Sequence, residues 1–183
     1  MKTTVKFLDN SIEFRNYEFF PSIAYSKSGK KEIKAEEIVE IDLEAAPPAL
    51  RIGNELVFVS AELRSELEVF AKQNNIKVRY RFDIWDAILE PFLDTEYTPE
   101  NATRNKESLE KYDLKSEQVE ELRARVGEMM AAYNFGTGLW DWVHLGLWDL
   151  LTAYKIAIGE VLTKDEYIEL YWESMKIALH SYD

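Results

Sequence analysis

The chain has 183 residues, 46% of them hydrophobic and 13% aromatic, which is typical of a globular protein and excludes a disordered one. It has no cysteine, which excludes disulfides and thiolate chemistry. Its net charge of −12 lies mainly in residues 81–183, with 10 Lys or Arg against 21 Asp or Glu, and this acidity argues against nucleic-acid binding while it permits a basic protein partner or a bound cation.

The first residues, Met1–Lys6, lead into a strand pattern rather than an apolar signal segment. No run reaches the roughly 18 consecutive apolar residues of a membrane span, because polar residues interrupt even the most apolar segment. We therefore expect a cytoplasmic protein without membrane attachment.

Short alternating apolar runs dominate residues 1–80 and predict β-strands. These runs are Val5–Leu8, Ile12–Phe14, Tyr17–Tyr25 and Ile38–Leu43. Because such runs can bury one face of a sheet, the first half of the chain is predicted to be rich in β-structure.

The clearest hairpin is predicted at Ala49–Ile52 and Leu56–Val59, which Gly53-Asn54 connects. Glycine tolerates the positive φ that a two-residue hairpin turn requires. Ser60 follows as a candidate N-cap of a helix that ends near Asn74-Asn75. The hairpin and this helix complete the expected first domain.

Helical periodicity and helix start signals characterise residues 81–183. Asp83 is a candidate N-cap of a helix that Pro91 ends or kinks, and Thr98-Pro99 starts a second helix. Ser116 starts a third helix, which Gly136-Thr137-Gly138 is predicted to end in a helix–helix turn.

Two further helices complete this half. Thr137 is a candidate N-cap of a Trp-rich helix that runs to about Ile158. Thr163 and Glu166 are predicted to form a capping box at the start of the last helix. In a capping box the side chain of each residue accepts a hydrogen bond from the backbone N–H of the other.

The order of elements in the first half, in which Ile33–Ile41 leads into the Gly53-Asn54 hairpin and then a helix containing Leu63–Leu67, resembles the bacterial pleckstrin-homology-like domains. The resemblance covers residues 1–76 and implies a small antiparallel β-sheet or barrel closed by one helix. It carries no function by itself, because such folds bind lipids, peptides and proteins alike. Lipid-binding members use a basic loop between early strands, to which Lys27–Lys31 is the nearest match, and we interpret this loop as a solvated turn.

We therefore predict an α+β protein. A β-rich, pleckstrin-homology-like domain in residues 1–80 is expected to pack on a helical bundle in residues 81–183, and the two are expected to share an interface.

A polar stripe is predicted on the Trp-rich helix, where a step of about 100° per residue places Asp141, His144 and Asp149 on one side. These are the candidate catalytic residues, with His144 as a general base that a carboxylate orients. Aromatic side chains would shape an apolar pocket beside them, and the candidate ligand-binding residues are Trp140, Trp142, Trp148 and Tyr133. The alternative, a helix whose polar face is solvated or satisfied by its neighbours, is favoured because no nucleophile is evident.

An acidic series is predicted on the helix after Asp83, where Asp86, Glu90 and Asp94 recur every four residues. Oxygen ligands of this kind can hold Mg²⁺ or Ca²⁺, so these are the candidate metal ligands. The spacing of an EF-hand and a Glu-x-x-His motif are both absent. A solvated acidic face is therefore favoured, and no cofactor is predicted.

Three tryptophans between Trp140 and Trp148 point around most of the predicted helix, so one face is expected to seal against another element or a partner. Our leading hypothesis is a non-enzymatic protein-interaction module that binds a protein partner or forms a homo-oligomer, with its acidic half attracting a basic partner. The alternative hypothesis is a small-molecule or divalent-cation binding protein, or a hydrolase, with its pocket at the Trp-rich helix, between it and the acidic helix that follows Asp83.

Overall fold

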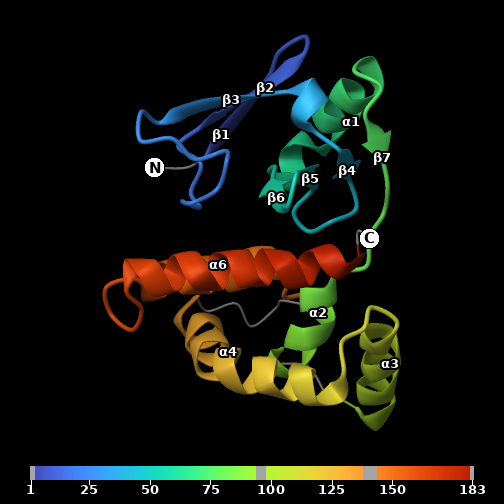
Figure 1. Cartoon of the computed structure of the whole chain (residues 1–183), viewed down its shortest axis with the longest axis vertical. Coiled ribbons are helices and arrows are strands. Elements are labelled where there is room, and N and C mark those ends of the chain that lie inside the picture. The colour runs from blue at the N-terminus through green and yellow to red at the C-terminus, as the bar shows by residue number, and fades with distance from the viewer. Residues whose placement is uncertain (1–2, 94–97, 138–143, 182–183) are drawn as a thin grey trace. The chain divides into compact units, whose positions relative to one another are not determined.

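A computed structural model describes residues 3–93, 98–137 and 144–181. By its internal contacts the chain divides into two compact units, Met1–Arg81 and Phe82–Asp183 (Figure 1). The first unit contains strands β1 to β7 and helix α1, and the second contains helices α2 to α6. The predicted α+β class is therefore confirmed.

The first sheet of unit 1 is antiparallel, with the order β1-β2-β3, and consists of β1 (Thr4–Phe7), β2 (Ser11–Arg15) and β3 (Lys30–Lys34). Ile12 of β2 pairs with Ile33 of β3, and both side chains are fully buried. Strand β3 was not predicted, because Ile33 is the one apolar residue in a run of charged ones. Lys30 of the supposed lysine loop lies in this strand, where its Nζ contacts Glu13 Oε2 at 2.6 Å.

The second sheet has the order β6-β5-β4-β7 and consists of β4 (Glu40–Asp42), β5 (Ala49–Ile52), β6 (Glu55–Phe58) and β7 (Lys77–Val78). The predicted hairpin is confirmed as the antiparallel pair β5 and β6, and Gly53 in its turn has a φ of +56°. Strand β7 pairs with β4 in parallel. The described strands thus form two sheets and no closed barrel.

Helix α1 (Arg64–Gln73) follows a 3-10 turn, Ala61–Leu63, that starts directly after Ser60. It ends at Gln73, with Asn74 as its C-cap residue, close to the predicted end at Asn74-Asn75, and it buries Leu67, Phe70 and Ala71. Because these residues recur at helical spacing, one face of α1 contributes to the core of unit 1.

The strand predicted at Tyr17–Tyr25 is wrong. This segment instead forms successive turns, in which the N–H of Ser22 donates to Phe19 O and that of Tyr25 to Ser22 O. Pro21 lacks the N–H that a ladder requires. The apolar pattern arises because Tyr17 and Phe19 are buried in the core from a loop.

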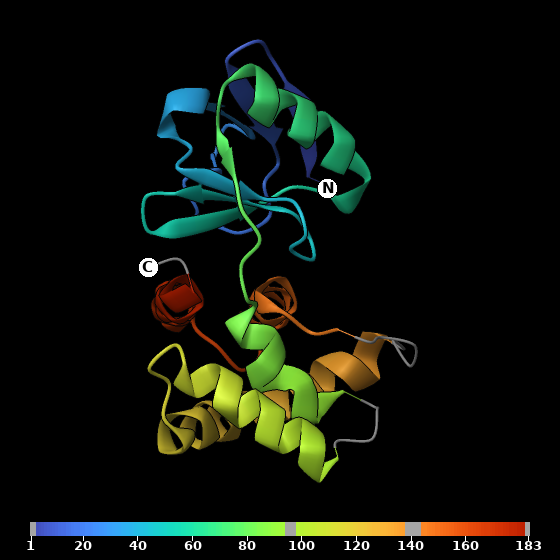
Figure 2. The ribbon, with the colours of Figure 1, turned by 90° about the vertical axis from the view of Figure 1, so that its right-hand side faces the viewer.

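Unit 2 is built from helices whose ends the local sequence explains, namely α2 (Ile84–Leu89), α3 (Pro99–Glu110), α4 (Ser116–Thr137), α5 (Leu147–Ala157) and α6 (Lys164–Ala178). Asp83, Thr98 and Thr163 cap α2, α3 and α6 with their side chains, as predicted. The 3-10 turn Glu90–Phe92, which contains Pro91, ends α2 early. Helices α5 and α6 run side by side and are seen end-on in Figure 2.

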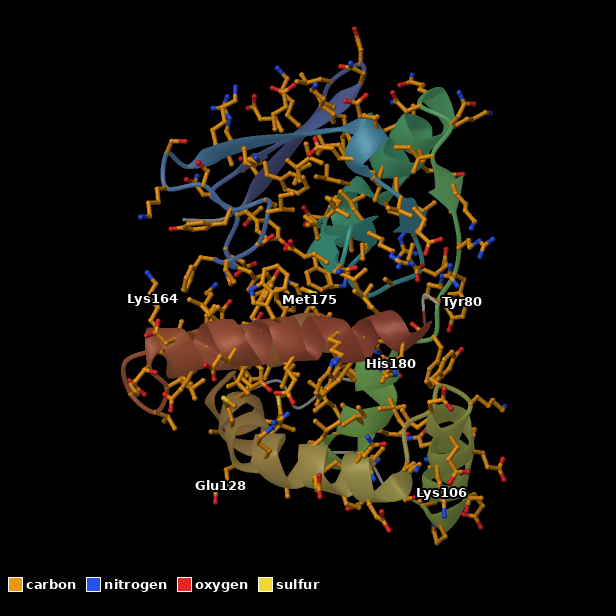
Figure 3. The ribbon with its side chains drawn as sticks, viewed as in Figure 1. Tyr80, Lys106, Glu128, Lys164, Met175 and His180 are labelled. Carbon is orange, nitrogen blue, oxygen red and sulfur yellow. The ribbon has the colours of Figure 1, made fainter. Side chains whose placement is uncertain are left out.

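The core of unit 2 joins its first helix to its last. Trp85 of α2 is fully buried, and its Nε1–H donates to the carbonyl oxygen of Ser174 in α6 at 2.9 Å. Met175 is fully buried as well, whereas Lys106, Glu128 and Lys164 point outward from their helices (Figure 3). Unit 2 therefore has a core of its own, and these three charged side chains lie at its surface.

Two predicted helix boundaries in unit 2 are wrong. Helix α4 continues through Gly136 to Thr137, so Thr137 ends one helix and does not cap the next. The helix predicted to run from Thr137 to Ile158 begins only at Leu147, because Gly146 is extended and serves as its N-cap residue. Consequently His144 lies before α5, and the polar stripe predicted along a single helix does not exist in that form.

Candidate functional site

The candidate site is a cluster of acidic groups around His144 in unit 2. It begins with Asp83, the N-cap of α2, whose Oδ1 accepts hydrogen bonds from the N–H groups of Trp85 at 2.9 Å and Asp86 at 3.1 Å. One carboxylate oxygen thus satisfies the first turn of the helix. The other oxygen, Oδ2, is available to face the chain that leads into α5.

His144 lies against both aspartates at the start of α2. Its Nδ1 is 2.9 Å from Asp86 Oδ1, and its Nε2 is 3.8 Å from Asp83 Oδ2. Nε2 is buried and has no hydrogen-bond partner among the described residues. The imidazole is therefore bonded on one side and faces a second carboxylate, beyond hydrogen-bond range, on the other.

Gly146 allows the two segments to approach each other this closely. A Cβ at this position would lie 2.6 Å from Asp83 Oδ2 and 2.9 Å from His144 Nε2, which no side chain tolerates without movement. Asp149, three residues on, accepts the N–H of Gly146 at 2.9 Å through Oδ2. This hydrogen bond closes the first turn of α5, and it places the negative charge of Asp149 at the N-terminal end of the helix, where the helix dipole favours it.

The surroundings of these groups shift their pKa values in one direction. Burial raises the pKa of Asp83 from 3.8 to about 6, although 32% of its side-chain surface remains open to solvent. The hydrogen bond to Asp86 raises the pKa of His144 above 6.5, against the opposing effect of burial. Burial also raises the pKa of Asp149. All three groups therefore bind protons more tightly in the folded protein than in the unfolded chain.

Of the candidate catalytic residues, the structure brings His144 and Asp149 into one neighbourhood, while Asp141 lies outside the described residues. The carboxylates closest to His144 are those of Asp83 and Asp86 at the start of α2, the acidic helix that the alternative hypothesis placed beside the Trp-rich segment. Asp149 is 2% exposed and is not part of a solvated face.

The candidate ligand-binding residues are divided in the same way. Trp140 and Trp142 lie outside the described residues. Tyr133 is 8% exposed, and its hydroxyl lies 3.5 Å from Asp149 Oδ1. Trp148 is half-buried in the first turn of α5.

Of the candidate metal ligands, the structure describes Asp86 and Glu90, and each has a different neighbour. Asp86 contacts His144, and Glu90 accepts a hydrogen bond from Asn105 Nδ2. Helix α2 ends at Leu89, so the spacing of four residues is not continued on a helix, and Asp94 lies outside the described residues. Within the part of the chain that the structure describes, no group of three or more His, Asp or Glu side chains is arranged to hold a metal ion.

The sequence analysis missed the role of Gly146, and it predicted Asp83 as a helix cap within an acidic cluster but not as a neighbour of His144. A local signal for Gly146 was present, because it precedes an apolar helical run and Asp149 follows three residues later, as in a helix N-terminus. No local signal connects Gly146 with Asp83, which lies 63 positions earlier.

Comparison with known proteins adds no family to this geometry: no family model matches the chain, and no curated protein or solved structure matches it. None of the helices in the described ranges is long and apolar enough to cross a membrane.

Proposed function

We propose that this chain is a non-enzymatic protein-interaction protein whose helical unit binds a basic protein partner. The distribution of charge carries this proposal. Residues 1–81 have 13 Lys or Arg and 13 Asp or Glu, whereas residues 82–183 have 9 and 21. The whole net charge therefore belongs to unit 2, and such a field attracts a partner of opposite sign.

Helix α6 offers the clearest contact surface in this unit. Asp165, Glu169 and Trp172 follow one another at intervals of four and three residues, which places them along one side of the helix, and all three are exposed. Trp172 keeps 40% of its surface exposed, and its indole packs edge-on against Tyr171. Tryptophan among carboxylates suits Lys or Arg side chains, since the ring face attracts the same cations.

A second copy of the chain is a poorer fit to this surface, because two faces of the same charge repel each other. The repulsion also argues against binding of nucleic acid through unit 2. A basic protein is the partner that the charge of unit 2 favours.

The pleckstrin-homology-like character of unit 1 is part of the same proposal. It is supported by the position of α1 directly after the β5–β6 hairpin. The proposal of a bundle in unit 2 is likewise supported by the pairing of α5 with α6 and of α4 with α5.

Native mass spectrometry of the full chain, purified gently from its own cells at about 0.1 M salt, tests the proposed function. We expect a bound basic protein that dissociates at about 1 M salt, where the screening length falls from about 10 Å to about 3 Å. Glu169→Lys should weaken the complex about tenfold, whereas Glu68→Lys, the same change at an exposed position of α1, should not. Recovery of the chain alone, with only copies of itself, or with only a small molecule would overturn the proposal.

A further inference from the structure

We propose that His144–Gly146 is a proton-operated latch, in which protonated His144 ties the chain entering α5 to the start of α2 and loss of that proton loosens the connection. This inference is independent of the proposed partner. It rests on the placement of His144 between two carboxylates and on the close approach that Gly146 permits.

The protonated state fits the geometry on both sides of the ring. A positively charged imidazole carries a proton on each nitrogen, so Nδ1–H donates to Asp86 Oδ1 and Nε2–H points toward the Asp83 carboxylate. Asp149 of α5 adds a third negative group that favours the charge. Every charged group that faces His144 from α2 and α5 therefore stabilises the imidazolium.

The neutral state fits on one side only. Because Nδ1 keeps its proton for Asp86, Nε2 presents a lone pair, and this lone pair faces Asp83 Oδ2. Two acceptors then oppose each other with no proton between them. The Asp83 carboxylate cannot turn away freely, since its other oxygen holds the N–H groups of Trp85 and Asp86.

The unfavourable contact of the neutral state would affect α5, because only a short segment separates His144 from this helix. Gly146 follows His144 by two residues, and its carbonyl oxygen accepts the N–H of Leu150 in the first turn of α5. A shift of His144 away from α2 would therefore displace Gly146 and weaken the hydrogen bonds at the start of α5. The fully buried Leu150 limits such motion to the helix end.

Protons have access to the latch, because 32% of the His144 side chain remains open to solvent. The raised pKa of His144 places the change above pH 6.5. The connection is expected to be tightest above about pH 6, where Asp83 is ionised, and to loosen as pH rises further through the folded-state pKa of His144.

Amide hydrogen exchange of the full chain between pH 5.5 and 8.5, corrected for intrinsic rates, tests this latch. We expect protection at the start of α5 to fall about tenfold with rising pH, while protection in α3 changes little. Nuclear magnetic resonance titration of the two histidines, with His180→Gln to assign them, should give the same midpoint for His144. His180→Gln itself should leave the fall in protection unchanged.

Asp86→Asn sharpens the test without removing His144. Loss of the carboxylate should lower the His144 pKa by about 1 unit, and the midpoint of exchange at α5 should move with it. His144→Gln should give low protection at every pH. The proposal is wrong if hydrogen-exchange protection of α5 stays constant while His144 titrates. It is also wrong if Asp86→Asn does not move the midpoint of the change in protection. Should His144→Gln fail to fold, the wild-type and Asp86→Asn curves alone decide.

Discussion

Carboxylates of low exposure have different cationic neighbours in the two units. In unit 1, Glu13 contacts Lys30 and Arg15, and the buried Glu40 accepts two hydrogen bonds from Arg81, at 2.8 and 2.9 Å. In unit 2, Asp83 and Asp149 rely on backbone N–H groups and on His144. Arginine and lysine keep their charge near neutral pH, whereas histidine does not.

This difference predicts which unit responds to pH. The contacts to Lys30 and Arg15 lower the pKa of Glu13, so its stabilising contribution is lost only on acidification. Burial raises the pKa of Asp83, and the raised pKa of His144 acts in the same direction. Asp42 is the exception in unit 1, because burial raises its pKa although three N–H groups, those of Arg81, Glu44 and Ala45, oppose the shift.

The largest effect is expected from Glu40→Ala in unit 1. Glu40 is 2% exposed, and its removal takes away the carboxylate that pairs with the partly buried Arg81 and Arg51. The free energy of unfolding should fall by about 3–5 kcal/mol, measured by urea unfolding. Hydrogen exchange should locate the loss in residues 1–81. The matched control is Glu36→Ala, whose pair with Lys34 is exposed on both sides and should contribute less than about 0.5 kcal/mol. Equal effects of the two variants would contradict the role given to burial.

A smaller effect is expected from Gly146→Ala in unit 2. The new methyl group would displace Asp83 Oδ2 and His144 Nε2, and we expect a cost of about 1–3 kcal/mol in thermal or urea unfolding. Gly53→Ala in unit 1 is the comparison, because nothing lies within 4 Å of the point that its new Cβ would occupy and only its φ of +56° resists the change, at about 1 kcal/mol. A Gly146→Ala protein as stable as wild type would show that the two segments are not held together.

The smallest effect is expected on the pH dependence of the free energy of unfolding. Because the folded-state pKa of Asp83 exceeds 3.8, its contribution to stability falls as pH rises from about 4 to about 6. Asp83→Asn keeps an oxygen that can cap α2 but cannot titrate. The stability of the variant should therefore not decrease over this pH range. At pH 7 it should be about 1–2 kcal/mol more stable than wild type, a value reduced because Asp83 is partly exposed to solvent.

Urea midpoints measured between pH 4 and pH 8 check this slope. Glu13→Gln in unit 1 is the control of opposite sign, since it should remove a loss of stability on the acid side. If both variants changed the curve in the same direction, the contrast between the units would be wrong.

Much of the fold followed from local patterns. Helix starts at Asp83, Thr98 and Thr163 were predictable because each needs one side chain and the next turn of backbone. The β5–β6 hairpin was predictable from Gly53 for the same reason. Strand β3 was not predicted, because Lys30 at its start pairs with Glu13 across the sheet, a contact that no local pattern encodes.

The candidate site was predicted only in part, for a related reason. His144 and Asp149 were selected from a helical spacing, but Gly146 starts α5 after His144 and breaks that spacing. Their neighbours Asp83 and Asp86 come from a helix about 60 residues earlier in the chain. A tertiary contact of this length depends on how helices pack, and one sequence alone does not give it.

The hydrogen bond from Trp85 to Ser174 has a consequence for biosynthesis. It joins residues 89 positions apart, and α2 leaves the ribosome long before α6. At a translation rate of about 5–20 residues per second, Ser174 is synthesised roughly 4–18 s after Trp85. During translation the β-rich unit can therefore fold first, while the helical unit keeps apolar surface exposed to chaperones until its last helix emerges.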